Sequence, residues 1–309
     1  MFNDVCYKYL NKEYEILNGG LTNKVYRVRV NSKYYIIKEL NDSKVLSDIE
    51  LSEKIANVVF NNGINAVCAI KFNNNYIQSV NGKNILIYKY CDGKILLTKE
   101  LTLDHVKKTA NMLGKLHSIK VGDTIDEKVY SKIDYLKYYN MLKYNNEKWC
   151  KYFKDNIDKL IDLYDNVYSN YLKLSNQKSY VHKDYNRKNI LWKEDIPYII
   201  DWETATIGNP SIDFFNSAWF LTADVDYDKY YAFAKEYFSI FKLDDDIKVS
   251  AYAAIIEECN WLEFSLKRVL ESNDEYEIKM GKESIESSLT EIINYYDKIP
   301  LMIEIINKI

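Results

Sequence analysis

The sequence predicts an α+β protein with two lobes, in which residues 1–90 form a β-rich first lobe and residues 91–309 a mostly helical second lobe. Short runs of β-branched and aromatic residues in the first part alternate with turn-forming pairs, which is typical of an antiparallel sheet. The second part carries apolar residues at helical spacing instead. Because binding sites favour domain interfaces, we expect the functional site in a cleft between the lobes.

The first lobe is expected to contain an antiparallel sheet and one helix. The pairs Asn31-Ser32 and Asn81-Gly82 favour tight hairpin turns between neighbouring strands. The strand-like runs occupy residues 14–17, 24–30, 33–40, 66–72, 76–80 and 84–90.

The single helix of this lobe is predicted to begin near Ser47 and to end at Gly63. Ser47 and Glu50 have the spacing of a capping box, in which each side chain bonds the other residue's backbone N–H. A glycine is the usual residue just past a helix end.

The second lobe is predicted to be helical except for one segment. Apolar residues repeat at helical spacing from Leu103 to His117, and further helices are expected over about 132–175 and over 211–309. Residues 180–203 instead contain strand-like runs joined by a turn at Glu194-Asp195.

Composition excludes several classes of protein. The 309 residues carry a net charge of −3, which argues against bulk attraction to nucleic acid or to an anionic membrane. No apolar run is long enough for a transmembrane helix, and the first residues lack the apolar core of a secretory signal. Five scattered cysteines without a CxxC pair and only three histidines favour neither a disulfide framework nor a zinc site. A cytoplasmic location is expected.

The chemistry is concentrated in one segment, where His182-x-Asp184-x4-Asn189 is followed by a hairpin and Asp201. Folding of the hairpin returns Asp201 to the loop that contains Asp184 and Asn189. Carboxylate and amide oxygens are ligands that suit Mg²⁺. A further carboxylate can orient a hydroxyl group and accept its proton, so the segment predicts phosphoryl transfer.

This motif resembles that of the aminoglycoside phosphotransferase and choline kinase family, which are small-molecule kinases with a protein-kinase-like fold. The likeness extends over most of the chain. Residues 19–28 resemble the phosphate-covering hairpin of choline kinases, and Ile37-Lys38 resembles the phosphate-binding lysine of the third strand. Residues 113–117 and 205–215 resemble other stretches of the family. The resemblance implies a bilobal kinase-like fold and transfer of the γ-phosphate of ATP.

By this resemblance, Asp184 would orient the hydroxyl group or act as its base. Asn189 and Asp201 would bind Mg²⁺, and Lys38 would contact the ATP phosphates. His182 would brace the loop. The hairpin and the hinge that follows the sheet would contribute further nucleotide contacts, through Gly20, Asn23, Tyr88, Tyr90 and Cys91.

The phosphate-binding lysine needs a carboxylate partner on the helix, and two are available. Glu50 lies on a polar face and fits the capping box, whereas Glu53 lies on an apolar face with Ile49 and Ala56. A charged residue on an inward face needs a buried partner. The sequence therefore predicts a Lys38–Glu53 pair, with Glu50 as the alternative.

Two departures from protein kinases stand out. Asn186 occupies the position where protein kinases often have a lysine, and the nearest cations are Arg187 and Lys188. Which cation stabilises the γ-phosphate therefore stays open. Trp202-Glu203 replaces Phe-Gly and no Ala-Pro-Glu follows, so no switching loop of the protein-kinase type is expected.

An acidic stretch points to the substrate. Between Asp195 and Ser265, nine Asp and five Glu stand against four Lys and no Arg, which leaves a local charge of −10. A solvated acidic face is the simpler explanation, and a field that attracts a cationic substrate is the alternative. Candidate substrate residues are Glu203, Asp213, Glu257, Glu258, Trp261 and Glu263, with the indole as an aromatic wall for a cation.

The predicted reaction is Mg²⁺-dependent transfer of the γ-phosphate of ATP, or of GTP, to a hydroxyl group of a small cationic molecule. Aminoglycoside-like and choline- or ethanolamine-like acceptors both fit. A kinase for a sugar or vitamin is a second interpretation, and a nucleotide-binding pseudokinase is a third, against which the intact Asp184, Asn189 and Asp201 argue. The acceptor, the choice between ATP and GTP and the oligomeric state are open at this level.

Overall fold

The computed structural model describes residues 1–17, 23–41, 45–122, 129–222 and 225–309. The chain divides into two compact units, each made of two separate stretches. The first contains Met1–Gly122 and Ser179–Ile207, and the second contains Asp123–Lys178 and Gly208–Ile309. An antiparallel sheet near the N-terminus and a mostly helical remainder confirm the predicted fold class. The predicted lobe boundary between residues 90 and 91 stays a prediction, since these units divide the chain elsewhere.

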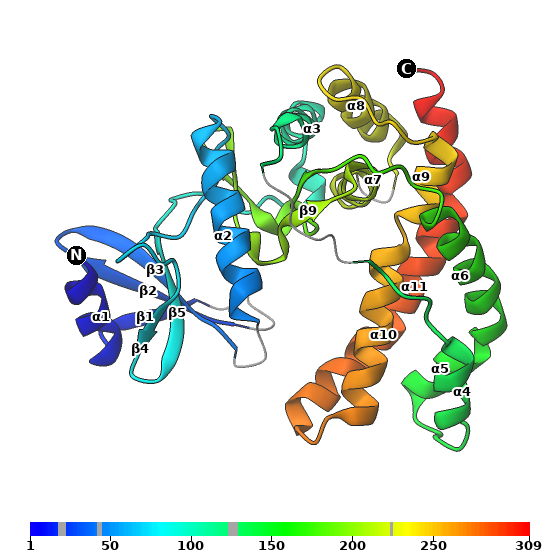
Figure 1. Ribbon diagram of the computed structural model, residues 1–309, viewed down its shortest axis with the longest axis horizontal. Helices are drawn as coiled ribbons and strands as arrows, with labels where there is room; N and C mark the ends of the chain where they lie inside the picture. Colours follow the sequence, from blue (N-terminus) through cyan, green and yellow to red (C-terminus); the bar gives the residue numbers. More distant parts are fainter. Residues whose placement is uncertain (18–22, 42–44, 123–128, 223–224) are drawn as a thin grey trace. The chain divides into compact units, whose positions relative to one another are not determined.

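A five-stranded antiparallel sheet with the order β1-β2-β3-β5-β4 forms the first part of the first unit (Figure 1). Two of its hairpins have the predicted two-residue turns. Asn31 and Ser32 have φ of 48° and 64°, and Asn81 and Gly82 have φ of 50° and 75°, as turns that match the twist of the strands require. The strands are β1 (Tyr14–Leu17), β2 (Lys24–Val30), β3 (Lys33–Glu39), β4 (Gln78–Val80) and β5 (Lys83–Lys89).

One strand expected from the sequence does not form. Residues 66–72 make only isolated bridges, from Ala66 to Ile199, from Ala69 to Tyr88 and from Phe72 to Asn75. Ala66 and Ala69 of this run are buried, each 5% exposed. The apolar run therefore indicated burial, but the predicted strand is wrong.

Two helices cover the sheet, where the sequence predicted one. Helix α1 (Phe2–Leu10) packs Val5 and Cys6 into a core cluster with Val28 of β2. Helix α2 (Leu46–Asn61) packs Ile49 against Leu86 of β5. The side chain of Leu86 points to the face of the sheet opposite to that of Ile85 and Ile87. The spacing of apolar residues in α1 was the signal that sequence reasoning missed.

The start of α2 corrects another expectation. Its N-cap residue is Val45, without a side-chain cap, so the Ser47–Glu50 capping box is wrong. Glu50 instead accepts backbone hydrogen bonds from Tyr76 and Ile77 at 3.1 and 2.9 Å. The predicted helix end is confirmed, because Asn62 is the C-cap and Gly63 follows with φ of +81°.

The rest of the first unit contains one long helix and short strands around the predicted chemical segment. Strands β7 and β8 pair as a hairpin whose turn is the expected Glu194-Asp195, with φ of 49° and 65°. Strands β6 and β9 form a second two-stranded sheet. The elements are η1 (Thr98–Glu100), α3 (Leu103–Ser118), β6 (Ser179–Val181), η2 (Arg187–Asn189), β7 (Ile190–Lys193), β8 (Ile196–Ile199), η3 (Trp202–Thr204) and β9 (Thr206–Gly208).

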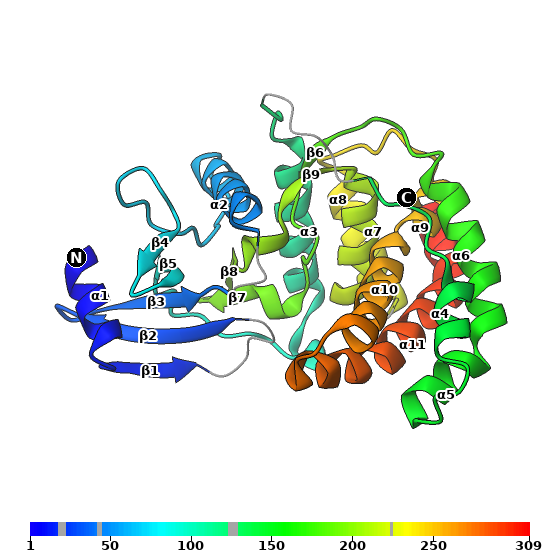
Figure 2. The same ribbon diagram turned by 60° about the horizontal axis from the view of Figure 1, so that its bottom comes forward.

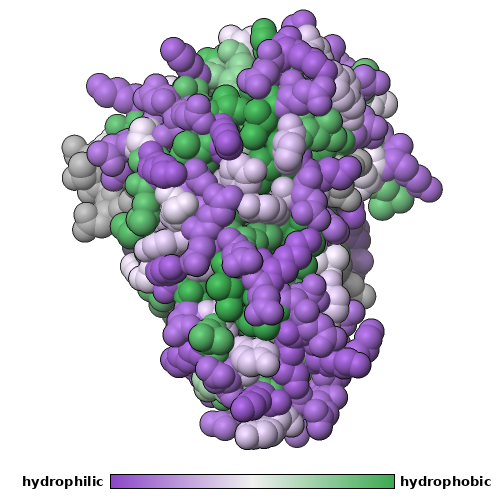
Figure 3. All heavy atoms as spheres, turned by 90° about the vertical axis from the view of Figure 1, so that its right-hand side faces the viewer, coloured by the Kyte–Doolittle hydropathy of each residue, from purple (hydrophilic) through white to green (hydrophobic). Residues whose placement is uncertain are grey.

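The described parts of the second unit are built from helices (Figure 2). They are α4 (Tyr135–Met141), α5 (Lys148–Asp155), α6 (Ile157–Tyr171), α7 (Pro210–Leu221), α8 (Tyr227–Phe238), α9 (Ile247–Ala253), α10 (Ile256–Glu271) and α11 (Glu275–Ile306). The face of this unit shown in Figure 3 mixes hydrophilic and hydrophobic side chains. Within the described ranges, no helix combines the length and the apolar character required to cross a bilayer.

Helices α10 and α11 approach closely at Gly281. A Cβ atom added there would lie 2.8 Å from the backbone oxygen of Ser265 and 2.8 Å from a methyl carbon of Val269. Arg268 of α10, which is 9% exposed, bonds Glu277 of α11 at 2.5 Å. The two long helices are therefore packed through a residue without a side chain and joined by a partly buried ion pair.

Candidate active site

The loop between β6 and η2 is braced by a fully buried histidine. One ring nitrogen of His182, Nε2, lies 3.1 Å from the backbone oxygen of Ile200, and the other, Nδ1, accepts the backbone N–H of Asp184 at 3.3 Å. Its ring packs on Trp202 with a centroid distance of 4.8 Å. These contacts join the loop to the chain that follows β8, which is the bracing role expected for His182.

Two amide side chains orient the Asp184 carboxylate. Asn189 donates to Oδ2 at 2.7 Å, and Asn186 donates to Oδ1 at 2.5 Å. Desolvation by the surrounding loop raises the pKa of Asp184 above its ordinary value, and the nearby Asp201 charge acts in the same direction. Sequence reasoning had treated Asn186 as a missing cation, whereas here it fixes the carboxylate and also caps η2.

The β7–β8 hairpin brings Asp201 back to Asn189, as the sequence predicted. The backbone N–H of Ile200 donates to the oxygen of Asn189 at 2.9 Å. Asp201 follows with φ of 60° and ψ of 63°, a left-handed conformation that costs an L-residue free energy. Its side chain is 42% exposed. The Asn189 amide donates through Nδ2 to Asp184, which leaves the hard oxygen Oδ1 as the atom suited to a metal.

The donor set fits Mg²⁺ in kind and number. Asn189 and Asp201 supply one amide and one carboxylate oxygen, and Mg²⁺ is usually bound by one or two carboxylates together with substrate phosphates. Among the residues with described positions, no group of three His, Cys, Asp or Glu side chains is arranged to bind a metal. Two oxygen ligands of this kind match a metal that takes its remaining ligands from substrate and water.

Lys38 does not pair with the helix carboxylate, which corrects the predicted Lys38–Glu53 pair. Its ammonium lies 2.8 Å from Asp201 Oδ1 and 2.5 Å from Glu203 Oε1. Burial tends to lower the pKa of Lys38, but these two carboxylates outweigh it, so the pKa lies above its ordinary value. Lys38 is charged and belongs to the same cluster as the predicted metal ligand.

Glu53 is buried as predicted but has other partners. Its carboxylate accepts the hydroxyl of Tyr88 at 2.6 Å and the backbone N–H of Ala69 at 2.9 Å. Burial raises the pKa of Glu53 to about 7, although both hydrogen bonds act to lower it. The choice of Glu53 over Glu50 as the inward carboxylate was correct, and its assignment to Lys38 was wrong.

The remaining predicted nucleotide contacts lie near the sheet. Asn23 is 9% exposed, donates to both Glu203 oxygens at 2.7 and 3.0 Å, and accepts the backbone N–H of Asn41 at 3.1 Å. The backbone N–H of Tyr90 bonds Tyr34, and the carbonyl of Cys91 accepts the N–H of Gly93. Gly20 lies outside the described residues, and contact of Tyr88, Tyr90 and Cys91 with adenine stays a prediction.

Glu203 was expected at the substrate, yet its side chain is 6% exposed and contacts Lys38 and Asn23.

The other predicted substrate residues belong to the second unit. Asp213 is buried on α7. On α10, Glu257 accepts from Tyr130 and Asn216 at 3.2 and 3.1 Å, and Glu263 accepts from Tyr138 at 2.8 Å. The α10 residues also include Glu258 and Trp261, and the indole is 40% exposed with its ring centroid 5.4 Å from that of Phe264.

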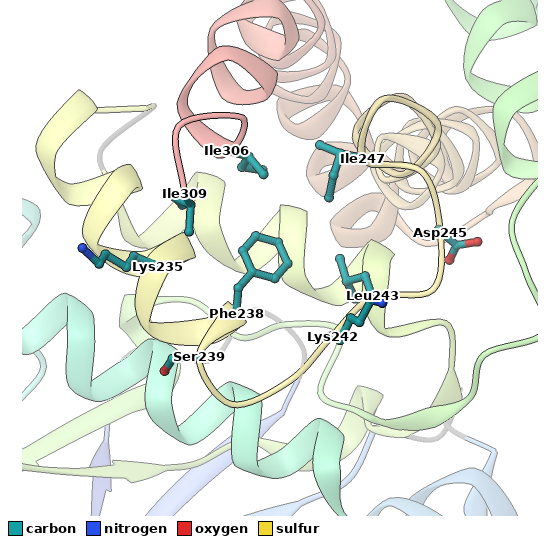
Figure 4. Close-up of a pocket in the computed structure, with 9 residues that line it drawn as sticks. All are labelled: Lys235, Phe238, Ser239, Lys242, Leu243, Asp245, Ile247, Ile306 and Ile309. Carbon is teal, nitrogen blue, oxygen red and sulfur yellow. The ribbon is translucent and has the colours of Figure 1, made fainter.

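A separate hollow of about 570 Å³ lies in the second unit (Figure 4). Phe238, Leu243 and Ile306 contribute apolar surface, and none of the predicted site residues lines it. The side chain of Asp245 in this lining accepts hydrogen bonds from Asn209 and Ser211 and so serves the local structure. We assign no reaction to this hollow.

Residues 13–245 match the model of a family described as the phosphotransferase enzyme family. The chain belongs to this family. The cluster of Asp184, Asn189, Asp201 and Lys38 lies within the matched residues, so the phosphotransferase has its predicted catalytic segment in the part of the chain that defines the family. No curated protein matches the sequence.

Solved structures of small-molecule kinases share the architecture of the phosphotransferase. A spectinomycin phosphotransferase bound to ADP and spectinomycin is 16% identical, with a TM-score of 0.73 and coverage of 95% of this chain and 97% of that one. The Plasmodium vivax ethanolamine kinase is 21% identical, with a TM-score of 0.61 and coverage of 91% and 83%. A choline/ethanolamine kinase family protein from Mesorhizobium loti is 12% identical, with a TM-score of 0.60 and coverage of 93% and 92%. These likenesses establish the shared fold and confirm the predicted small-molecule kinase architecture.

Proposed function

We propose that the protein transfers the γ-phosphate of ATP, with Mg²⁺, to a hydroxyl group of a small cationic molecule. One observation carries this proposal. Lys38 of β3 contacts Asp201, 163 residues later in the chain, and Asp201 follows the hairpin that starts at Asn189, whose amide donates to Asp184. One unit therefore contains a cation for phosphates, hard oxygens for a metal and an oriented carboxylate. Phosphoryl transfer needs this set of groups.

Each group has a distinct role in this proposal. Asp184 orients the acceptor hydroxyl and takes its proton, and the amides of Asn186 and Asn189 keep the carboxylate in place. Lys38 binds the phosphates of the nucleotide. Asn189 and Asp201 would hold Mg²⁺, which would supply neutralisation of phosphate charge. GTP is the alternative donor, since the groups that we assign contact phosphates, which ATP and GTP share.

The cationic acceptor is supported by observations on this chain and on the neighbours. Residues 195–265 carry the charge of −10, and Trp261 of α10 is 40% exposed, an aromatic surface of the kind that attracts cations. Structures of the same architecture are named for spectinomycin and for choline or ethanolamine. A sugar or vitamin acceptor is the second candidate, and the intact catalytic set argues against a pseudokinase.

A coupled assay of ADP release tests the proposal. Purified protein with Mg²⁺ and ATP is supplied in turn with spectinomycin, an aminoglycoside, choline, ethanolamine, thiamine and a neutral sugar, and GTP replaces ATP in a second series. We expect release that depends on a cationic acceptor and is absent in Asp201→Ala with unchanged melting temperature. Turnover of a neutral acceptor alone would reject the cationic class, and equal release by Asp201→Ala would reject the assigned metal ligand.

A further inference from the structure

The side chain of Glu203 is much more buried than that of Asp201, the neighbouring carboxylate that we predict to bind the metal. Its side chain is 6% exposed, whereas that of Asp201 is 42% exposed. Both of its oxygens accept hydrogen bonds from Asn23, and Oε1 also contacts the Lys38 ammonium at 2.5 Å. The burial and these contacts direct Glu203 toward the sheet and not toward solvent.

One of the two donors lies on a strand of that sheet, and the other lies just before a neighbouring strand. Lys38 lies on β3, and Asn23 immediately precedes β2 and accepts the backbone N–H of Asn41, beyond the end of β3. One carboxylate therefore fixes two side chains and, through Asn23, the backbone at both strand ends. From this geometry we propose that Glu203 is the residue that positions Lys38 and Asn23 for the nucleotide phosphates.

Charge balance gives the physical reason. A buried ammonium needs a counterion, because removal of water is costly for an unpaired charge. Asp201 supplies one negative charge to Lys38 here, but under the proposed function Asp201 would also hold Mg²⁺. Glu203 would then remain as the counterion that keeps the Lys38 ammonium in place. The inference rests on the proposed function in this respect.

The helix carboxylate is unsuited to this task. Both oxygens of Glu53 are already used, one by Tyr88 and one by the backbone N–H of Ala69. Its raised pKa leaves it only partly ionised at neutral pH, so it is a weak counterion. The positioning role that the sequence assigned to Glu53 is therefore filled by Glu203, two residues after the predicted metal ligand.

A double-mutant cycle on nucleotide affinity tests the proposal, with ADP as the probe and calorimetry as the measurement, both with Mg²⁺ and with EDTA. Glu203→Gln keeps the side-chain size and removes the charge. We expect it to weaken ADP binding roughly tenfold or more, as loss of a charge-assisted contact does. Lys38→Met should weaken binding similarly, and the double variant should be no worse than Lys38→Met, because Glu203 acts through the lysine.

Controls separate this role from others. Glu39 follows Lys38 on β3, and its carboxylate accepts hydrogen bonds from Tyr9 and Tyr26. The control variant Glu39→Gln should leave ADP affinity unchanged. Glu203→Asp retains the charge and should bind ADP more tightly than Glu203→Gln. If Glu203→Gln does not fold, the same cycle is run with Glu203→Asp, whose shorter side chain must also show its effect only when Lys38 is present.

Three results would overturn the inference. Additive losses in the cycle would mean that Glu203 does not act through Lys38. A defect seen with Mg²⁺ and absent with EDTA would make Glu203 a metal ligand, and a change confined to the KM of the acceptor would make it a substrate residue. Absence of ADP binding by the unchanged protein would instead reject the proposed function, so the two failures are distinguishable.

Discussion

At the residue scale, the environment of each carboxylate decides its chemistry. Four carboxylates of the first unit differ in this way. Asp184 is oriented by two amides, and the side chain of Asp201 is 42% exposed. Glu203 is paired with Lys38, and Glu53 is buried against Tyr88. Such differences move pKa values apart and so assign different tasks to the same functional group. Each assignment therefore has its own test.

Replacement of Asp184 by Asn is expected to separate chemistry from binding. The change keeps the size of the side chain and removes its ability to accept a proton, so kcat should fall by about 10²–10⁴-fold while ADP affinity is retained. Steady-state kinetics and calorimetry measure the two quantities. Asp195→Asn on the β7–β8 turn, whose partners are His105 and Lys108, is the control and should leave kcat unchanged. Lost ADP binding with normal kcat would assign Asp184 to the nucleotide.

Glu53 is expected to make stability depend on pH. Its pKa is raised from 4.5 to about 7, so between these values the folded state holds a proton that the unfolded state has released. The contribution of Glu53 to stability is therefore fully present below pH 4.5 and is lost as pH rises to about 7. Glu53→Gln should remove a decline on the order of 3 kcal/mol across this window.

Urea unfolding at several pH values between 4.5 and 8 measures this effect. Glu50→Gln, on the same helix, controls for the loss of one negative charge. Equal pH dependence in the unchanged protein and in Glu53→Gln would show that another group binds the proton.

At the element scale, the close approach of α10 and α11 gives a third prediction. Gly281→Ala gains about 1 kcal/mol of helix propensity, but the added Cβ meets the backbone oxygen of Ser265 at 2.8 Å, and backbone cannot rotate aside. Overpacking of this kind costs about 1–3 kcal/mol, so we expect net destabilisation. Thermal unfolding should show a lower Tm, whereas the exposed Ser287→Ala on α11 should not. A raised Tm in Gly281→Ala would mean that the helices separate without cost.

Elements defined by local chemistry could be predicted from the sequence, and those defined by distant partners could not. The turns at Asn31-Ser32 and Asn81-Gly82 follow from residues that tolerate positive φ, and the structure contains both. Residues 66–72 are apolar enough for a strand, but strand pairing requires a neighbour with a free edge, which no local pattern encodes.

The same division holds for the candidate site. Asp184, Asn189 and Asp201 lie within one short hairpin segment, so their spacing was sufficient to bring them together. The partner of Lys38 depends on the packing of β3 against a segment 163 residues later, and the helix pattern pointed to Glu53 instead. The orienting role of Asn186 could not be predicted, because its hydrogen bond to Asp184 depends on the conformation of the loop.

At the scale of the whole molecule, the acidic stretch has more local functions than its charge count indicated. Asp226 and Asp246 cap helices, Asp245 bonds Asn209 and Ser211, and Asp195 pairs with Lys108. Hydrogen-bond donors therefore offset part of the repulsion that a cationic substrate was invoked to relieve. The stretch still carries its net charge, so its field remains testable.

A charge-steered acceptor should bind less tightly as salt is added. The screening length falls from about 30 Å at 0.01 M to about 8 Å at 0.15 M ionic strength, so the KM of a cationic acceptor should rise over this range. Initial rates at saturating ATP measure it, with sucrose at equal osmolality as the control. A KM that does not respond to salt would leave the acidic stretch a purely structural feature.

The discontinuity of the first unit has a consequence for its biosynthesis. Residues 123–178, which belong to the second unit, are translated between the two stretches of the first unit. At about 5–20 residues per second this takes roughly 3–11 s. During that interval the nascent sheet contains Lys38, but its carboxylate partners Asp201 and Glu203 have not yet been made. Lys38 therefore makes neither of these two ion pairs until residues 201–203 have been translated.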